Sequence, residues 1–399
     1  MPFRGERYRA TDRLSRLIAP PYDVITPPER GRLAALDEHN IVHVMLPEAP
    51  AGMTSVDRYA WAAERLSAWR ATGVLARDPE DALYVMAQGN RLGVFAAVAA
   101  EGYEPRRVRP HEQTHPGPKA DRLALLRATR TNIESIFLIA PDKGGDLARA
   151  LAAAVQRPPD TTAELDGVGI RLWVVQGRDL SRFPLPPSPL YIADGHHRYE
   201  TASAYARENP AADRVLAFVA SARDLGLTIL PTHRVIFGAG REPAALLDGW
   251  RAWFDLAEVP PGVDPLAHLA ALGGDRTACL VAWADGRVTA LALRRDAPLD
   301  SIAGLGASAA VRALDAARVE TLVVKAILSA SPATPTLRYT ADAAEAVDAV
   351  RRGGATAAVL LNPTRIEQVF AVADAGDVMP PKSTYFFPKV PSGVVLRPL

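Results

Sequence analysis

The stretch that decides the fold reads Tyr191-Ile192-Ala193-Asp194-Gly195-His196-His197-Arg198-Tyr199-Glu200. The apolar run Pro189–Ala193 predicts a short buried strand that ends at the turn pair Asp194-Gly195. The positions after it have the i, i+3, i+4, i+7 spacing of one helix face: Tyr199, Ala202, Ser203 and Ala206. We therefore expect a strand, a tight turn and a helix in direct succession.

The first turn of this helix carries an unusual set of polar side chains. A helix N-terminus offers unpaired backbone N–H groups and the positive end of the helix dipole, which suits phosphate. Arg198 can form bidentate bonds to phosphate, and His196 and His197 add further donors. Asp194 can bind Mg²⁺ or orient a histidine. The alternative without function is an Asp-Gly turn followed by a capped surface helix. Two histidines and an arginine in the first turn of the helix favour a binding site instead.

Strand-like and helix-like segments alternate along the rest of the chain. Turn pairs at Gly89-Asn90 and Asp285-Gly286 each lie between two apolar runs and predict hairpins. Helices are expected over about 121–129 and 146–155, and a strand over 214–221. This alternation predicts an α/β or α+β fold.

The segment Pro110–Lys119 contains a possible reactive carboxylate, Glu112. His111, Glu112 and His115 match the H-E-x-x-H pattern of zinc hydrolases, which needs both histidines one turn apart on a helix. Pro116 follows immediately and disfavours a helical His115. An extended loop that carries Glu112 beside Lys119 fits these residues better, and a solvated polar loop is the alternative without function.

A third polar segment is Met379–Lys389. Lys382, Ser383 and Thr384 in it can bind an anionic group such as a substrate carboxylate. The aromatic residues that follow are more typical of core or groove packing. The sequence contains no G-x-x-x-x-G-K-[ST], G-x-G-x-x-G or G-x-S-x-G motif, which argues against a P-loop enzyme, a dinucleotide-binding fold and the common hydrolase elbow.

Composition sets further bounds on the class of protein. The 399 residues carry a net charge of +1, which argues against non-specific binding to nucleic acid. The single cysteine, Cys279, cannot form an internal disulfide or a cysteine-rich metal site. No apolar run reaches the length of a membrane span, and Met1–Arg7 lacks the apolar core of a signal peptide. We expect a cytoplasmic protein that does not contact membranes.

Together these segments resemble a bacterial and archaeal family known only as a domain of unknown function, DUF1015. The resemblance extends over nearly the whole chain. It is carried by Pro20–Ile25, by His111-Glu112 with Gly117–Lys119 and Asp121-Arg122, by Asp194–Glu200, by Leu230–Arg234 and by Met379–Phe387.

The family is in turn similar to free serine kinases of the ParB/sulfiredoxin-like superfamily. This resemblance implies a Pro-His-Glu segment with a catalytic base, matched by His111 and Glu112. It implies a turn that grips nucleotide phosphates, matched by Asp194–Arg198. It also implies that Lys382, Ser383 and Thr384 hold the acceptor. The expected activity is transfer of a phosphoryl group from ATP or ADP, with Mg²⁺, to a hydroxylated amino acid such as free L-serine.

The resemblance implies a ParB-like nucleotide-binding core at 81–238, an N-terminal segment at 1–80 that packs on it, and a C-terminal α/β domain at 239–399. The chain departs from the kinases by its greater length and by the long stretch between Glu112 and Asp194. Two other readings stay open at this point: a nucleotide-binding switch of the ParB type without small-molecule phosphorylation, and the zinc hydrolase. The choice of acceptor, the donor nucleotide and the oligomeric state are not decided by the sequence.

Overall fold

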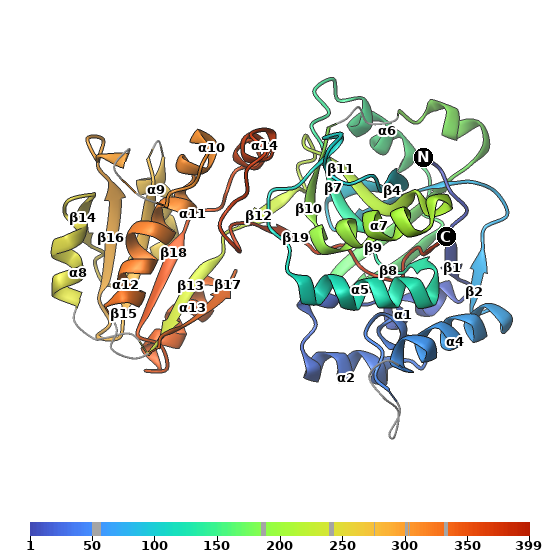
Figure 1. Ribbon diagram of the computed structural model, residues 1–399, viewed down its shortest axis with the longest axis horizontal. Coiled ribbons are helices and arrows are strands. Elements are labelled where there is room, and N and C mark those ends of the chain that lie inside the picture. Colours follow the sequence, from blue (N-terminus) through green and yellow to red (C-terminus); the bar gives the residue numbers. More distant parts are fainter. Residues whose placement is uncertain are drawn as a thin grey trace. The chain divides into compact units, whose positions relative to one another are not determined.

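The chain folds into two compact units, each of which mixes helices and strands (Figure 1). The computed structural model describes residues 1–49, 57–184, 189–238, 243–274, 276–299, 302, 304–330 and 334–399. Unit 1 comprises Met1–Pro110, Thr114–Thr228 and Pro388–Leu399, and unit 2 comprises His111–Gln113 and Ile229–Phe387. The α/β class predicted from the sequence is confirmed.

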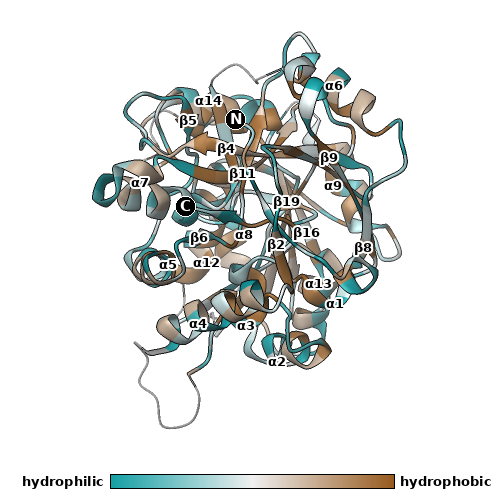
Figure 2. Cartoon of the chain, turned by 90° about the vertical axis from the view of Figure 1, so that its right-hand side faces the viewer, coloured by the Kyte–Doolittle hydropathy of each residue, from teal (hydrophilic) through white to brown (hydrophobic). Residues whose placement is uncertain are grey.

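Unit 1 is built on an eight-stranded mixed sheet with the order β5-β10-β7-β11-β4-β3-β9-β8. Its strands are β3 (Leu83–Gln88), β4 (Arg91–Ala99), β5 (Val108–Arg109), β7 (Ile136–Ala140), β8 (Thr161–Leu165), β9 (Val168–Val175), β10 (Leu190–Asp194) and β11 (Arg214–Ser221). Figure 2 shows hydrophobic ribbon in the central strand β4, whereas the edge strand β8 is more hydrophilic. The central strands therefore form the core.

The helices of unit 1 are α1 (Leu14–Leu17), α2 (Pro27–Leu36), α3 (Val42–Met45), α4 (Asp57–Ala71), α5 (Pro116–Thr129), α6 (Asp146–Ala154) and α7 (His196–Glu208). Helix α7 packs beside α5, and α5 packs beside α4 (Figure 1). Helices α6 and α7 place Leu147, Leu151, Tyr199 and Ala202 in one core cluster with alternate residues of the sheet, such as Val85.

The other alternate residues of the central strands form a row of aromatic rings. Tyr84 pairs with Phe95, Phe95 with Phe218, and Phe218 with Phe137 across neighbouring strands. The Phe95 and Phe218 ring centroids are 5.1 Å apart, a spacing typical of favourable aromatic pairs. These rings lie on the face opposite to the one that Val85 helps to form.

The segment Pro388–Leu399 completes unit 1 by pairing with earlier parts of the chain. Strand β20 (Arg397–Pro398) pairs with β6 (Thr131–Asn132), and isolated bridges join Leu396 to Glu6 and Ser392 to Ala19. A further two-stranded sheet joins β1 (Glu6–Tyr8) to β2 (Leu75–Arg77). Strand pairing between segments far apart in the sequence therefore completes the structure of unit 1.

Unit 2 contains a six-stranded antiparallel sheet with the order β14-β16-β15-β18-β13-β17. Its strands are β13 (His233–Phe237), β14 (Phe254–Glu258), β15 (Ala278–Trp283), β16 (Val288–Leu293), β17 (Thr336–Thr340) and β18 (Ala357–Leu361). Alternate residues of β15 enter two separate cores, Cys279 and Val281 in one and Leu280 and Ala282 in the other. The sheet is therefore covered on both faces.

The helices of unit 2 are α8 (Pro243–Trp250), α9 (Pro265–Gly273), α10 (Ala309–Arg312), α11 (Asp315–Val319), α12 (Lys325–Ser329), α13 (Ala343–Arg351) and α14 (Ile366–Asp374). A short two-stranded sheet joins β12 (Thr228–Leu230) and β19 (Tyr385–Phe387). Within the described ranges of the chain, no helix is both long and apolar enough to cross a bilayer.

Both hairpins predicted from the sequence are confirmed, one as β3–β4 and the other as β15–β16. The strand predicted at 214–221 is β11. The start of the helix predicted at residue 121 is wrong, because α5 begins at Pro116. Proline is favoured at the first helical position, where its missing N–H costs no hydrogen bond and its fixed φ suits the helix. The expected division at 1–80, 81–238 and 239–399 stays a prediction.

Candidate functional site

The predicted strand, turn and helix form as expected at Leu190–Glu208. Strand β10 ends at Asp194, Gly195 turns the chain, and α7 begins at His196. Gly195 has φ +91°, and a Cβ there would lie 3.0 Å from Nε of Arg198. Glycine is therefore required both by the left-handed backbone and by the close approach of Arg198. Because glycine has no side chain, Gly195 does not cap the first N–H groups of α7.

Asp194 is held between two cations of unit 1. Lys389 Nζ donates to its Oδ1, and Arg198 Nη2 donates to its Oδ2. The Asp194 side chain is 12% exposed. Burial alone would raise the pKa of its carboxyl, but Lys389 and Arg198 outweigh burial and hold the pKa well below the usual value. Asp194 is therefore ionised at neutral pH.

Arg198 lies beneath the turn rather than on its surface. Its side chain is 8% exposed, and Nη1 donates to the backbone oxygen of Ser135. Burial would lower its pKa, but Asp194 and Glu134 raise it above the usual value, so the guanidinium is charged. Both terminal nitrogens thus donate within the protein. The predicted bidentate grip of Arg198 on phosphate stays a prediction.

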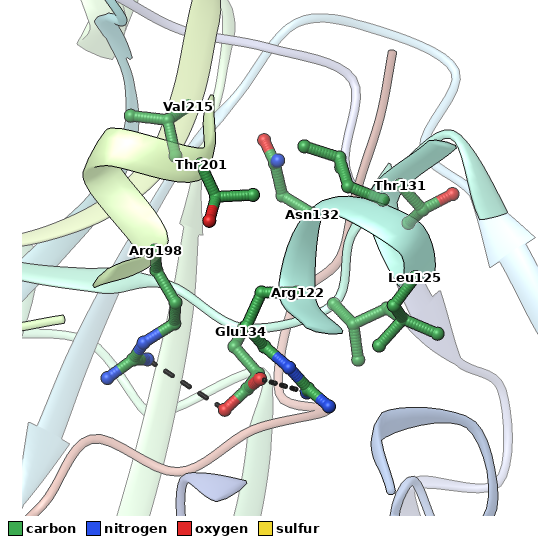
Figure 3. A pocket seen from close by; sticks show the side chains of 10 residues that line it. Arg122, Leu125, Thr131, Asn132, Glu134, Arg198, Thr201 and Val215 are labelled. Atoms are coloured by element: carbon green, nitrogen blue, oxygen red, sulfur yellow. Dashed lines mark hydrogen bonds and ion pairs between the residues drawn. The ribbon is translucent and has the colours of Figure 1, made fainter. Parts of the chain in front are cut away.

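A buried ladder of charges continues from Arg198 toward α5 (Figure 3). Glu134 Oε1 lies 3.9 Å from Arg198 Nη1, and its Oε2 lies 3.3 Å from Arg122 Nη1. The backbone N–H of Tyr22 donates to Glu134 Oε1 at 3.0 Å, and the Arg122 guanidinium lies 4.3 Å from the centre of the Tyr22 ring. A cavity of about 50 Å³ lies beside these side chains. The segment Pro20–Ile25 is thereby joined to the turn.

The position of Lys389 is fixed through its backbone. Gln88 Nε2 donates to the Lys389 carbonyl at 2.8 Å, and Arg91 donates to the carbonyl of Pro388. Arg91 is fully buried, 4.7 Å from the centre of the Phe137 ring. Burial lowers the pKa of Arg91 to about 10, which still leaves it charged at neutral pH. Two buried polar side chains, Gln88 and Arg91, therefore fix the backbone from which the Lys389 side chain extends.

The start of α5 is tied to the first turns of α7. The His115 N–H donates to Nε2 of His197 at 2.8 Å, which makes His197 a neutral imidazole protonated at Nδ1. Burial and the nearby His115 lower the pKa of His197, in agreement with the neutral form. Thr114 and Lys119 both donate to Glu200 Oε2, at 2.7 and 2.9 Å. His196, the other histidine of the turn, is buried.

The carboxylate Glu112 lies with Thr384 in unit 2. Thr384 Oγ1 lies 3.1 Å from Nε2 of the buried His111 and 3.5 Å from Glu112 Oε1. The Met379 N–H donates to the His111 carbonyl at 2.8 Å, which anchors the two segments to each other. The Glu112 side chain is 30% exposed. Two of the three predicted segments therefore meet through His111, Glu112 and Thr384.

The other residues predicted to hold the acceptor differ in their surroundings. Ser383 is buried, and its hydroxyl donates to the Pro380 carbonyl at 2.7 Å. Lys382 is exposed and has φ +55°, a backbone conformation that few side chains adopt. Such strain in a lysine is often found at functional positions.

The zinc-hydrolase pattern does not have the geometry that the motif requires. Residues 111–115 are not helical, and His115 has extended φ and ψ of −105° and 146° before Pro116. The spacing of one helical turn between His111 and His115 is therefore absent. Among the residues that the structure describes, no three His, Cys, Asp or Glu side chains gather as a metal site would need.

The surroundings of Asp194 also do not fit a directly bound Mg²⁺. Mg²⁺ is held by carboxylate oxygens, phosphates and waters. Both oxygens of Asp194 already accept from a cation, Lys389 or Arg198. Asp194 therefore has no oxygen left for direct coordination of Mg²⁺ in this arrangement.

Residues Thr232, His233 and Arg234 of the segment Leu230–Arg234 are buried in unit 2. The Leu361 N–H donates to Nδ1 of His233 at 3.2 Å, and Arg234 Nε lies 3.3 Å from Glu320. Burial and Arg234 lower the pKa of His233 to about 4. These contacts are typical of a buried structural segment.

Sequence reasoning did not single out Lys389 or Glu134. Lys389 lies in the polar segment Met379–Lys389, in which the resemblance points to Lys382 and not to Lys389. Glu134 lies directly after Ile133 and two residues before the buried strand β7. A charged residue beside such an apolar run is rarely buried without a partner. The position of Glu134 next to the predicted strand is therefore the sequence signal that points to a buried ion pair.

A family model matches residues 1–317 of the chain, and its description is "Protein of unknown function (DUF1015)". The chain belongs to this family. No curated protein matches it.

Several solved structures are similar to the chain at low identity. A conserved hypothetical protein from Pyrococcus furiosus is 14% identical, with a TM-score of 0.37, over 75% of this chain and 93% of the other. A free serine kinase in complex with AMP is 12% identical, with a TM-score of 0.38, over 76% and 89%. SbnI from Staphylococcus aureus with a C-terminal truncation is 12% identical, with a TM-score of 0.38, over 74% and 84%.

Proposed function

We propose that this protein binds a nucleotide by its phosphates and transfers the terminal phosphoryl group to the hydroxyl of a small acceptor. The observation that carries this proposal is the turn at Gly195, where Lys389, Asp194 and Arg198 surround the start of α7. Backbone N–H groups at a helix N-terminus, with cations beside them, form an anion site.

The phosphates would lie against the first turn of α7. The N–H groups of His196 and His197 would donate to phosphate oxygens, and the helix dipole would add to their effect. His197 is neutral and protonated at Nδ1, so it can also donate a hydrogen bond. Arg198 contributes a fixed positive charge from beneath the turn, where it keeps Asp194 in place.

The reaction itself would need little covalent chemistry from the protein. The acceptor oxygen attacks the terminal phosphorus and forms a new P–O bond. The bond from phosphorus to the bridging oxygen breaks, and its electron pair stays on the departing nucleotide. Transfers of this kind depend on positioning and on stabilising charge around the phosphoryl group. ATP would become ADP, or ADP would become AMP.

Glu112 would accept the proton of the acceptor hydroxyl. It is a partly exposed carboxylate with Thr384 at 3.5 Å and His111 at 3.9 Å. A carboxylate in reach of a primary hydroxyl can act as a general base.

Free L-serine is the acceptor that we propose. Lys382 and Thr384 would bind its carboxylate, since charge-assisted bonds are stronger than neutral ones. The backbone at Ser383 is fixed by its own hydroxyl and by Thr364, whose hydroxyl donates to the Ser383 carbonyl at 2.8 Å. Mg²⁺ would take part as the counter-ion of the nucleotide substrate.

The test is to incubate the protein with Mg²⁺ and L-serine, with ATP and ADP in turn, and to measure phosphoserine by mass spectrometry. L-Alanine is the control substrate, because a site built to bond a hydroxyl rejects the analogue that lacks it. The exposed Glu367 of α14 offers a matched control, Glu367→Gln, for the variant Glu112→Gln. Phosphoserine from one donor, lost in Glu112→Gln alone, supports the proposal.

The outcomes without phosphoserine lead to different conclusions. If nucleotide binds and is slowly hydrolysed but no acceptor is phosphorylated, the protein is a nucleotide-dependent switch. If a different hydroxyl compound is phosphorylated, the reaction class stands and the serine assignment is wrong.

A further inference from the structure

The buried pair of Lys389 and Asp194 occupies the place where a metal was expected. The carboxylate that the sequence suggested as a Mg²⁺ ligand is instead covered by an ammonium group. A lysine so placed supplies a positive charge beside the N-terminus of α7 without any metal.

The two cations on Asp194 differ in their freedom to move. Arg198 is 8% exposed and donates to Asp194 and Ser135 while it faces Glu134, so its planar group is fixed from several sides. The Lys389 side chain is 14% exposed and ends in a compact ammonium on a flexible stem. The flexible stem of lysine allows the ammonium to turn from Asp194 toward an anion.

The base of the Lys389 side chain, in contrast, is held firmly. Gln88 and Arg91, both buried, donate to the carbonyls of Lys389 and Pro388. Burying an arginine is costly unless its donors find partners, and Arg91 uses them on this segment and on Gln88. A fixed backbone that carries a long, flexible side chain suits a residue that reaches a ligand from one defined point.

We propose that Lys389 binds the nucleotide phosphates directly. When the ligand occupies the first turn of α7, the Lys389 ammonium turns from Asp194 Oδ1 to a phosphate oxygen. Asp194 holds the ammonium in place while no ligand is present, and it competes with the phosphate for that ammonium. This inference rests on the proposed function and assigns to a residue of the chain the charge that a metal at Asp194 would have supplied.

The competition gives two variants opposite effects on affinity. Lys389→Met keeps the length of the stem and removes the charge, so it should weaken ADP binding about 10- to 100-fold. Lys389→Arg keeps the charge and should lose much less. Asp194→Asn keeps the shape and an acceptor for Arg198 but releases the ammonium, so it should strengthen ADP binding severalfold. A metal-ligand role for Asp194 predicts that Asp194→Asn weakens binding instead.

The experiment is calorimetric titration of ADP and of pyrophosphate into the wild type and these variants, with and without Mg²⁺. Lys143→Met, at an exposed lysine of unit 1, is the matched control and should bind as the wild type does. Thermal unfolding of each variant shows whether the fold is intact. Pyrophosphate reports the phosphate site even where the nucleoside is wrong.

The possible results separate the inference from the proposed function. If the wild type binds pyrophosphate but no nucleotide, the proposed function is wrong, and a loss of pyrophosphate binding in Lys389→Met still supports the inference. If Lys389→Met binds both ligands as tightly as the wild type, the inference is overturned. It is also overturned if the wild type binds neither ligand, or if Asp194→Asn weakens binding as a lost metal ligand would.

Discussion

Replacing Glu134 by glutamine should cost unit 1 a large part of its stability. The Glu134 side chain is 5% exposed and lies between Arg122 and Arg198, which are themselves 5% and 8% exposed. Removing one member of a buried ion pair costs about 3–5 kcal/mol, because the remaining charge is left without its partner. Here both arginines keep a second carboxylate, Asp121 or Asp194. We therefore expect a smaller loss, about 2–4 kcal/mol in the free energy of unfolding.

The assay is urea unfolding monitored by hydrogen exchange. Exchange in peptides from α5 and α7 reports the unfolding of unit 1 separately from that of unit 2. Glu208→Gln is the matched control, because Glu208 pairs with Arg127 on the exposed surface and its loss should leave the midpoint unchanged. A Glu134→Gln variant as stable as this control would refute the idea that the ladder of charges holds the turn. Charge-independent packing would then have to position Arg198.

Four further predictions follow from the geometry of the two units. Glu112→Gln should lower the rate of transfer by about 10²–10⁴ with nucleotide affinity little changed, and a fully active variant would disprove its role as base. Gly195→Ala should weaken ADP binding and lower the melting temperature, since its φ of +91° and the nearby Arg198 both oppose a side chain; calorimetry and thermal unfolding check this. Elemental analysis should find no stoichiometric zinc, and about one zinc per chain that is lost in His115→Ala would show the opposite. The pKa of His233 falls to about 4 in the folded state, so protonation of this side chain opposes folding. Unit 2 should therefore keep its full stability above pH 6.5 and lose about 3 kcal/mol as the pH drops from 6.5 to 4. The variant His233→Asn should show a smaller pH dependence when unfolding is measured over this range.

The sequence predicted local structure well where the chain signals it locally. The strand, turn and helix at Leu190–Glu208 follow from an apolar run, an Asp-Gly pair and a helical spacing, all within one short stretch. The Asp285-Gly286 hairpin likewise depends on adjacent residues. In these places the preferences of neighbouring residues agree with the final fold.

The partners of the turn could not be predicted in this way. Lys389 is 195 positions from Asp194 along the chain, and Gln88 is 301 positions from Lys389. Such pairs depend on the order of strands in the sheet and on the return of Pro388–Leu399 to unit 1, which no local pattern encodes. Lys382 was favoured over Lys389 because residue types alone do not distinguish two lysines of one segment.

The return of Pro388–Leu399 to unit 1 has a consequence for how the protein is made. Synthesis on the ribosome is vectorial, and domains generally begin to fold as they emerge. Unit 1 cannot close β20 on β6, or bring Lys389 to Asp194, until all of unit 2 has been translated. A nascent chain therefore carries the Gly195 turn long before it carries the lysine that completes it. A polypeptide released before residue 389 is translated would have the turn but not its second cation.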